Sequence, residues 1–281
     1  RELDIDLGAV PGSGKGGRVL HGDLDSFEPT PAPVSAPSVP QARAVPSGHE
    51  EHIKIIGLRR KIAEQMVRSK QSAPHFCYVD EVDMSALDGF RKRLKGKARE
   101  RGVKLTFLPF FMKALVQTFR LFPNVNANVI EDPFTLVVKG DVNIGVATDT
   151  PQGLFVPVVK NVEQKTILQL AAEIQDLTDR TRAGKASLDE LTGGTFTITS
   201  VGAFGGMFAT PILNHPEVAI LGINRIHERP VVRDGQIVVR KMLYLSSSFD
   251  HRVLDGAVAA RWTTALKDIL EQPESMLLEM I

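Results

Sequence analysis

The chain has 281 residues, of which 43% are hydrophobic and 24% are charged, and its formal net charge is +1. This composition is typical of a globular protein with one large domain or two smaller ones. The near-neutral charge gives no drive toward nucleic acid, and no apolar run reaches the roughly 18 residues that cross a membrane. A single cysteine, Cys77, excludes an internal disulfide and a multi-cysteine metal site, and it favours a reducing compartment.

The first 27 residues predict a small helical module. A short run with apolar residues at helical spacing is followed by a glycine-rich loop at residues 12–18 and a second helical turn. The loop contains a formal GxGxxG, but no strand precedes it, so a dinucleotide site is not favoured. A module this small has little core of its own and is typical of a docking domain. Its loop residues Lys15 and Arg18 are the candidate contacts for an acidic partner.

Residues 28–50 differ in composition from the rest of the chain. Six of the 17 prolines fall here, interleaved with Ala, Ser and Val, and the segment contains no aromatic residue, Leu or Ile. Such a segment cannot bury enough apolar surface to offset the entropy of ordering it. We therefore expect a semi-stiff linker between the module at residues 1–27 and a domain at residues 51–281.

From Ile53 onward, predicted helices and strands alternate. Apolar residues at helical spacing predict helices over residues 58–67, 87–94, 107–119, 167–177 and 258–269, the third of them buried all round. Strands are expected over residues 76–82, 142–147, 154–159, 195–200, 218–224 and 241–249, with a hairpin over residues 231–239. The Asp234-Gly235 pair of the hairpin fits a type I′ turn. This order predicts one α/β domain with a mixed sheet.

One stretch, residues 246–256, concentrates reactive side chains at the end of a strand. Three serines are followed by two aspartates, a histidine and an arginine before the last predicted helix begins. Histidine is the side chain most able to accept a proton near neutral pH, which makes His251 the candidate base. Asp255 stands where a carboxylate offsets the dipole of a helix N-terminus. The same residues also fit a salt-bridge cluster with Asp255 as helix cap, and the residue types alone favour neither interpretation.

This stretch also resembles a known family. Residues 249–256, FDHRVLDG, resemble the DHRxxDG signature of the 2-oxo acid dehydrogenase complex dihydrolipoyl acyltransferase (E2) family, whose catalytic domain is related to chloramphenicol acetyltransferase. Four further stretches resemble sequence motifs of the family and follow in the same order: residues 153–158, 195–200, 210–214 and 216–222. The module and the linker resemble the family's peripheral subunit-binding domain and its linker. Within the family, the branched-chain members are the ones most similar to this chain over residues 74–83, 102–111 and 238–256.

The resemblance implies a chloramphenicol-acetyltransferase-like α/β fold and an activity that moves an acyl group between dihydrolipoyl-lysine and coenzyme A. In the family's mechanism His251 removes the proton of the attacking thiol, because the thiolate is the nucleophile. The hydroxyl of Thr199, supplied by a neighbouring subunit, stabilises the oxyanion. Asp255 keeps the geometry of the site, and Arg59 or Arg60 is the expected partner of its carboxylate.

The resemblance further implies which residues contact coenzyme A. Seven Lys and Arg residues lie between Arg91 and Arg101, and most of them fit a solvated basic face. Arg91 alone of the seven matches a family position, and arginine suits phosphate because of its planar fork of donors. The full set of family positions expected to line the coenzyme channel is Arg91, Thr106, Asp149, Ser200, Asn224 and Ile226.

Assembly and location are expected to follow the family. The catalytic domain would form a homotrimer that assembles into a larger cage, with 24 subunits if it follows most members. Residues 1–27 would dock the decarboxylase or the dihydrolipoyl dehydrogenase component. The chain contains no lipoyl domain, so the lipoyl-lysine is expected on another domain. The expected location is the cytoplasm in a bacterium and the mitochondrial matrix in a eukaryote, with no metal, nucleic acid or membrane involved.

The residues themselves also allow other interpretations. His75 and Cys77 point to one face of a predicted strand, as a hydrolase dyad would, but no third group orients them, and a buried structural cysteine is favoured. A non-catalytic scaffold subunit would be marked by loss of the histidine, which is present here. A stand-alone acetyltransferase would have no use for a docking module. Acetyl- or succinyl-specific members of the same family remain an alternative to a branched-chain enzyme.

Overall fold

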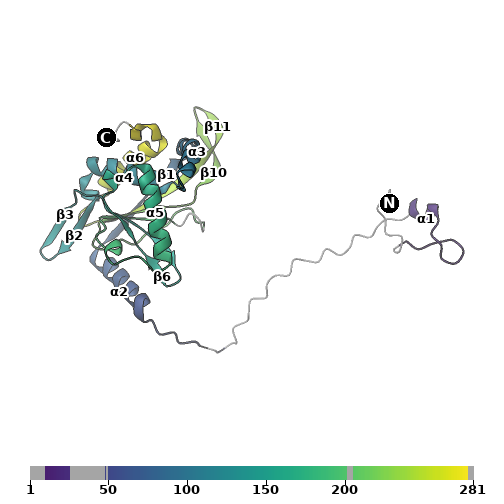
Figure 1. Ribbon diagram of the computed structural model, residues 1–281, viewed down its shortest axis with the longest axis horizontal. Helices are drawn as coiled ribbons and strands as arrows, with labels where there is room; N and C mark the ends of the chain where they lie inside the picture. Colours follow the sequence, from purple (N-terminus) through teal and green to yellow (C-terminus); the bar gives the residue numbers. More distant parts are fainter. Residues whose placement is uncertain (1–9, 26–47, 49, 201–204, 278–281) are drawn as a thin grey trace. The chain divides into compact units, whose positions relative to one another are not determined.

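The computed structural model describes residues 10–25, 48, 50–200 and 205–277. The chain divides into two compact units, Arg1–Ile53 and Lys54–Ile281, which are described separately (Figure 1). The first helical run expected near the N-terminus, nearly all of the expected linker and part of the glycine-rich turn after residue 200 lie outside the described residues.

In the small unit, a tight loop precedes α1 (His21–Asp25). The Asp23 carboxylate closes this loop by accepting hydrogen bonds from the Leu20 amide at 2.8 Å, and from the amide and hydroxyl of Ser13 at 3.0 and 2.7 Å. These bonds, that from Leu20 first, lower the pKa of Asp23. Lys15 and Arg18 are exposed on the loop.

The large unit is built on one mixed sheet. Its strands lie in the order β1 (His75–Asp83), β11 (Gln236–Asp250), β9 (Ala219–Ile223), β8 (Phe196–Ser200), β4 (Ile144–Val146) and β7 (Val158–Val159), and β10 (His227–Arg233) pairs with β11. The pairs β9–β8 and β8–β4 are parallel and the others are antiparallel. This arrangement confirms the mixed α/β sheet expected from the alternating pattern.

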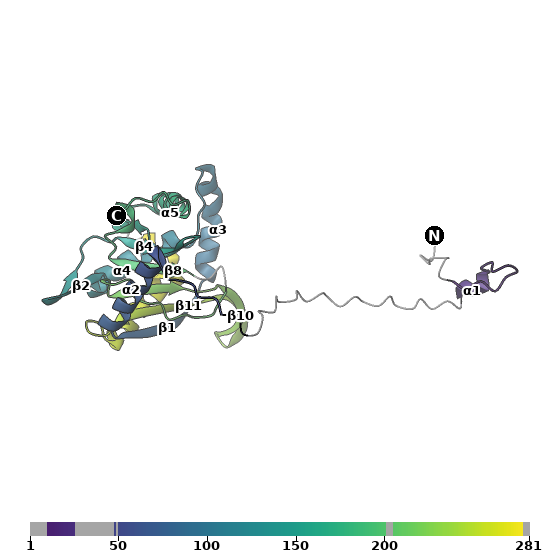
Figure 2. The same ribbon diagram turned by 90° about the horizontal axis from the view of Figure 1, so that it is seen from below.

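In the described part of this unit, the sheet is surrounded by the helices α2 (Gly57–Ser72), α3 (Ser85–Glu100), α4 (Leu108–Leu121), α5 (Ile167–Arg182) and α6 (Gly256–Glu271) (Figures 1 and 2). Helix α4 is buried nearly all round, as its apolar sequence predicts, and it packs against α5 and α6. On α6, Trp262 is fully buried, and its ring lies 6.0 Å from that of Phe196 and 5.7 Å from that of Phe249. The main core therefore lies between the sheet and these helices.

The opposite face of the sheet carries the polar side chains. Strand alternation turns Ser246 on β11 away from the core that Phe249 enters. There the Ser246 hydroxyl accepts a hydrogen bond from the Ala209 amide at 3.2 Å. The Ser69 hydroxyl of α2 donates to the Leu213 carbonyl at 2.7 Å. Helix α2 and the segment at residues 205–216 therefore cover this face.

The structure differs from the sequence predictions in three places. The hairpin β2 (Ala127–Glu131) to β3 (Phe134–Val138) was not predicted, and the predicted strands at residues 142–147 and 154–159 are interrupted by the small hairpin β5 (Thr148–Thr150) to β6 (Gly153–Phe155). Cys77, expected to be buried, is exposed, because β1 is an edge strand. The type I′ turn is confirmed by positive φ angles of 50° at Asp234 and 76° at Gly235.

Among the described residues, no helix has both the length and the apolar character that crossing a membrane requires.

Candidate functional site

His251 lies in the turn that follows β11. Its backbone amide donates to the Pro74 carbonyl at 3.0 Å, and its ring packs 4.4 Å from the ring of Phe76 on β1. The residue is exposed, and no other described residue forms a hydrogen bond with its ring nitrogens. The backbone hydrogen bond and the ring of Phe76 therefore hold the residue, and both ring nitrogens are without a hydrogen-bond partner within the described part of the chain.

An ionic network fixes the residues on either side of His251. The Arg252 guanidinium bonds the Asp250 carboxylate at 2.6 Å and reaches Glu131 on β2 at 3.0 Å. Glu131 also accepts from His215 at 2.9 Å. The hydrogen bonds from Arg252, followed by that from His215, lower the pKa of Glu131 to about 2. The Asp and Arg of the DHR motif thus form ion pairs that stabilise the turn around His251.

Asp255 caps helix α6. Its carboxylate accepts a hydrogen bond from the Val258 amide at 2.9 Å, as expected of an acidic N-cap. Arg60 pairs instead with Glu64 at 2.9 Å. Within the described residues, the pairing of Asp255 with Arg59 or Arg60 that the resemblance suggested is therefore not formed.

Thr199 lies on β8 and faces away from the main core, because its neighbour Ile198 is buried in that core. In the sheet register Thr199 lies beside Gly222, which lies beside Ser246. His251 follows Ser246 by five residues, so the two candidate side chains are two strands and five residues apart. At strand spacing this separation is roughly 15–20 Å. One chain therefore does not bring Thr199 and His251 together.

The structure does form a cleft at the carboxyl ends of β8 and β9. Its volume is about 640 Å³, within the range of small-molecule sites. One wall is the segment before α4, and another is the face of α5 that carries Ala171, Ile174 and Thr178. Four of the six residues expected to contact coenzyme A line this cleft: Thr106, Ser200, Asn224 and Ile226.

Asn224, which lines this cleft, contains a buried acceptor without a donor. The side chain is 2% exposed, and its amide nitrogen donates to the Tyr244 carbonyl at 2.7 Å and to the Ser246 hydroxyl at 2.9 Å. The Oδ1 atom is buried and has no partner among the described residues. A buried acceptor without a donor is costly, so an N–H group of a ligand that reached Oδ1 from the cleft would be stabilised there.

The other two expected contacts lie elsewhere. Arg91 is behind the cleft wall, where it pairs with Asp88 at 2.9 Å and stacks 4.3 Å above the ring of Phe107. Asp149 is exposed on β5 and does not line the cleft. Sequence reasoning missed three cations that do line it, Lys104, Arg182 and Arg225. No local motif marks them, because they come from three separate segments.

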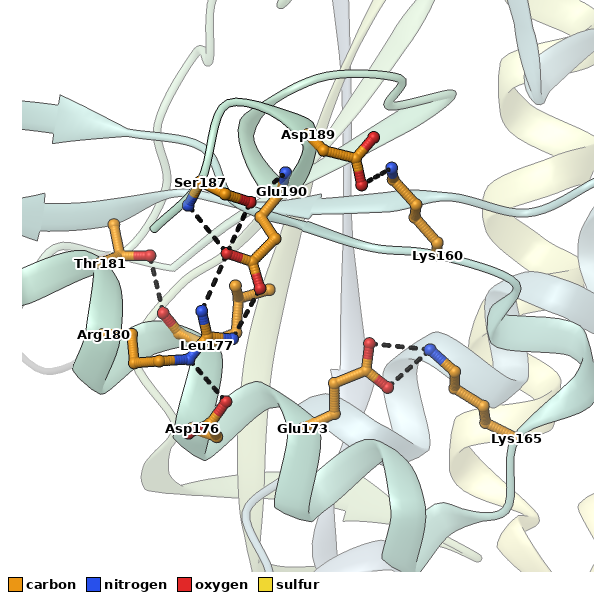
Figure 3. Close-up of polar contacts among 10 residues, drawn as sticks. All are labelled: Lys160, Lys165, Glu173, Asp176, Leu177, Arg180, Thr181, Ser187, Asp189 and Glu190. Atoms are coloured by element: carbon orange, nitrogen blue, oxygen red, sulfur yellow. Dashed lines mark hydrogen bonds and ion pairs between the residues drawn. The ribbon is translucent and has the colours of Figure 1, made fainter. Parts of the chain in front are cut away.

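Helix α5 is held in place by ion pairs away from the cleft (Figure 3). The Arg180 guanidinium forms two hydrogen bonds to Glu190, at 2.7 and 2.8 Å, and one to Asp176 at 2.8 Å. Lys165 and Lys160 add pairs with Glu173 and Asp189, respectively. Of these contacts, the two hydrogen bonds from Arg180 to Glu190 tie α5 to the loop that leads into β8, whose last residue, Ser200, lines the cleft.

A buried carboxyl group was also missed by sequence reasoning. Glu217 is 4% exposed, and its carboxyl group accepts from the Thr197 hydroxyl at 2.6 Å and from the Asn214 amide at 3.0 Å. Burial raises its pKa to about 8 despite these bonds. Thr197 lies on the same face of β8 as Thr199, two residues away. The Glu217 network thus supports the strand that carries the candidate hydroxyl.

The hydrolase dyad is not formed. The Nδ1 atom of His75 lies 2.7 Å from the Ala73 carbonyl, and its Nε2 accepts from the Leu213 amide at 3.0 Å. Cys77 instead contacts the Ser248 hydroxyl at 3.1 Å. Both ring nitrogens of His75 are therefore occupied, and neither is available to a thiol.

Comparison with known proteins identifies the family. Residues 47–278 match the model of the 2-oxoacid dehydrogenases acyltransferase (catalytic domain), and residues 1–25 match that of the E3-binding domain. The chain therefore belongs to the 2-oxoacid dehydrogenase acyltransferase family. This confirms the family expected from the DHRxxDG stretch.

The chain is similar over nearly its whole length to acyltransferase components of two kinds of complex. It is 47% identical to the lipoamide acyltransferase component of the branched-chain alpha-keto acid dehydrogenase complex of Pseudomonas putida, and 42% identical to the dihydrolipoyllysine-residue acetyltransferase component of the pyruvate dehydrogenase complex of Bacillus subtilis. Each alignment covers 99% of this chain and 66% of the relative, so the chain spans about two thirds of their length.

Solved structures share the fold. The structure of Azotobacter vinelandii dihydrolipoamide acetyltransferase superposes with a TM-score of 0.79 at 41% identity, covering 86% of this chain and 100% of that one. A truncated catalytic core of the 2-oxoacid dehydrogenase multienzyme complex from Thermoplasma acidophilum gives 0.73 at 42% identity, covering 80% and 99%. The acyltransferase fold expected from the resemblance is thereby confirmed.

Proposed function

We propose that this chain is the acyltransferase component of a 2-oxo acid dehydrogenase complex and transfers an acyl group between dihydrolipoyl-lysine and coenzyme A. The observation that carries the proposal is the imidazole of His251, which is exposed and, among the described residues, is held by the hydrogen bond of its backbone to Pro74 and by the ring of Phe76. The Azotobacter vinelandii structure comes from an investigation of a serine, a histidine and an asparagine in that enzyme's catalytic mechanism.

The spacing of those three residues supports the same roles here. In the Azotobacter enzyme the serine stands 52 positions before the histidine, and the asparagine stands four after it. Thr199 and Asp255 stand at the same spacings from His251. Threonine keeps the hydroxyl of serine. Asp255 replaces the amide by a carboxylate that caps α6 and so holds the turn containing His251.

The chemistry requires a base and an oxyanion donor. His251 takes the proton of the attacking thiol, and the resulting thiolate adds to the carbonyl carbon of the thioester. The hydroxyl of Thr199 donates a hydrogen bond to the oxyanion, which is worth about 3 kcal/mol in comparable sites. The carbon–sulfur bond to the leaving thiol then breaks, and that sulfur recovers the proton from the imidazolium of His251. No side chain of the site itself is acylated.

We propose that the site is shared between two copies of the chain. A hydrogen bond needs about 3 Å, whereas Thr199 and His251 of one chain are roughly 15–20 Å apart. Thr199 of a neighbouring copy must therefore complete the site, in agreement with the homotrimer that the resemblance implies. The cubic core of a pyruvate dehydrogenase complex, which is 40% identical with a TM-score of 0.79, supports further assembly into a 24-subunit cage.

Coenzyme A fits the cleft at the ends of β8 and β9. Its pantetheine arm carries amide N–H groups that suit the unpaired Oδ1 of Asn224. Its phosphates suit Lys104, Arg182 and Arg225. Ser200 lines the cleft next to Thr199, so a thiol at the inner end of the arm would approach the candidate hydroxyl.

We propose that the acyl group is branched-chain. This is supported by the branched-chain relatives at 47% and 45% identity, although the pyruvate-complex relatives are nearly as similar.

We further propose that residues 1–27 bind the dihydrolipoyl dehydrogenase or the decarboxylase component, since residues 1–25 match an E3-binding domain. Lys15 and Arg18 are exposed and would contact an acidic partner. The lipoyl-lysine would be carried on another domain.

The test is a transfer assay on the full chain with isobutyryl-, acetyl- and succinyl-dihydrolipoamide as donors. His251→Ala should lower turnover at least 100-fold while sedimentation shows unchanged assembly. His52→Gln, which changes an exposed histidine outside the site, is the matched control and should keep full activity. Near-normal turnover of His251→Ala would refute the base assignment. Wild-type chain that is inactive with every donor would identify a scaffold subunit.

A further inference from the structure

The C-terminal half of α3 and the segment after it carry a row of exposed cations. Lys95, Lys97 and Arg99 are exposed on the helix, and Arg101 and Lys104 follow it. None of the five has an ion-pair partner within the described part of the chain. We name these five residues the basic rim.

The other cations of α3 have carboxylate partners. Arg91 and Lys92 pair with Asp88 at 2.9 and 3.0 Å, and Arg93 lies 3.6 Å from Glu274. Burial alone would raise the pKa of Asp88, but hydrogen bonds from Lys241, Arg91 and Lys92 outweigh it, and the pKa is lowered. The helix thus separates into a paired half and an unpaired half.

The unpaired charges carry a cost within the helix. Lys95 and Arg99 are four residues apart, as are Lys97 and Arg101, and like charges at this spacing destabilise a helix. The helix dipole at the C-terminus offsets part of this repulsion. Glu100 is the one acidic residue among the described residues 95–104. A row of repelling cations with so little compensation indicates a role in attracting an anion.

The basic rim reaches the cleft through its last residue. Lys104 itself lines it, and the backbone amide of Lys104 lies 3.4 Å from the side-chain oxygen of Gln175 on α5, which also lines it. At the other end of this wall, Arg91 holds the Leu105 carbonyl at 3.4 Å and the ring of Phe107 at 4.3 Å. Helices α3 and α5 lie near each other in both views (Figures 1 and 2). Helix α3 thus leads directly into the cleft wall.

We propose that the basic rim steers coenzyme A into the cleft. This rests on the proposed function, which makes coenzyme A the ligand of that cleft. Coenzyme A carries a diphosphate and a 3′-phosphate, and charges act over about 10 Å at 0.1 M salt. A charged surface beside a cleft raises the association rate of an oppositely charged ligand, and the gain falls as salt is added. The rim therefore acts on arrival of coenzyme A and not on the chemical step.

The experiment neutralises three rim residues that do not line the cleft. The variant Lys95→Gln, Lys97→Gln, Arg99→Gln should raise the KM for coenzyme A about threefold to tenfold at low salt, with kcat unchanged. The charge-reversed variant, with Glu at the same positions, should give a larger rise. The matched control is Lys61→Gln, Arg68→Gln, Lys70→Gln on α2, which removes the same charge from exposed positions.

A measurement of coenzyme A binding tests the steering independently of the acyl transfer activity. The association rate of coenzyme A, followed by stopped-flow mixing without an acyl donor, should fall in the rim variants, and the difference should vanish near 0.5 M salt. An association rate equal to that of wild type at low salt, or an equal loss in the α2 control, would overturn the proposal. A chain that binds coenzyme A with this salt dependence but transfers no acyl group would refute the proposed function and leave the steering intact.

Discussion

Replacing Glu217 by glutamine should change how the stability of the fold depends on pH. The pKa of Glu217 is raised from its ordinary value of 4.5 to about 8 in the folded chain, because the carboxyl group is buried. Between these pH values the unfolded chain releases the proton and the folded chain keeps it. The stabilisation by the neutral form is therefore complete below about pH 4.5 and is lost as the pH rises to about 8. At about 1.4 kcal/mol per pH unit, the loss is about 5 kcal/mol.

Glutamine imitates the neutral acid. Its amide oxygen can accept from Asn214, and its amide nitrogen can donate to the Thr197 hydroxyl, so both contacts are kept with the direction of the Thr197 hydrogen bond reversed. Glu217→Gln should thus match wild type near pH 5 and exceed it at pH 9. For a domain of this size, 5 kcal/mol corresponds to about 10 °C or more in Tm.

The assay is thermal unfolding of both proteins from pH 5 to 9. Only the difference between them isolates this residue, since other groups titrate in both. Glu64→Gln, which changes an exposed glutamate on α2, is the control and should differ from wild type by the same small amount at every pH. A Tm difference for Glu217→Gln that stays constant over this range would refute the reasoning.

Three further predictions concern the site. Thr199→Val should lower turnover about 100-fold with an unchanged KM for coenzyme A, whereas Thr199→Ser should stay near wild type; a raised KM in Thr199→Val would make Thr199 a binding residue. Asn224→Ala should weaken coenzyme A binding about tenfold in calorimetry, because a buried acceptor is removed, and unchanged affinity would contradict its role. Arg180→Met removes the hydrogen bonds to Glu190 and Asp176, so it should lower the Tm. It should also raise the KM for coenzyme A by a larger factor than it changes kcat. An unchanged KM would show that these hydrogen bonds are not needed to position α5 at the cleft.

Much of the fold could be predicted from local patterns. The buried helix α4 follows from a run that is apolar nearly all round, and the β10–β11 turn follows from Asp234-Gly235. The β2–β3 hairpin was missed because its strands form a separate small sheet, and residues such as Ile130 and Phe134 are exposed. Cys77 was misplaced for a related reason, since an apolar strand does not reveal that it lies at the edge of its sheet.

For the candidate site too, some features follow from local sequence and others only from the tertiary structure. The sequence by itself identified the histidine, the capping aspartate and the family, because each depends on a few neighbouring residues or on a contiguous motif. The resemblance already implied that Thr199 comes from a neighbouring subunit, and the strand register gives the physical reason. Only the tertiary structure decided that Lys104, Arg182 and Arg225 meet at one cleft and that Glu217 is buried. Burial, strand order and the meeting of distant segments arise from packing of the whole domain, which no local pattern contains.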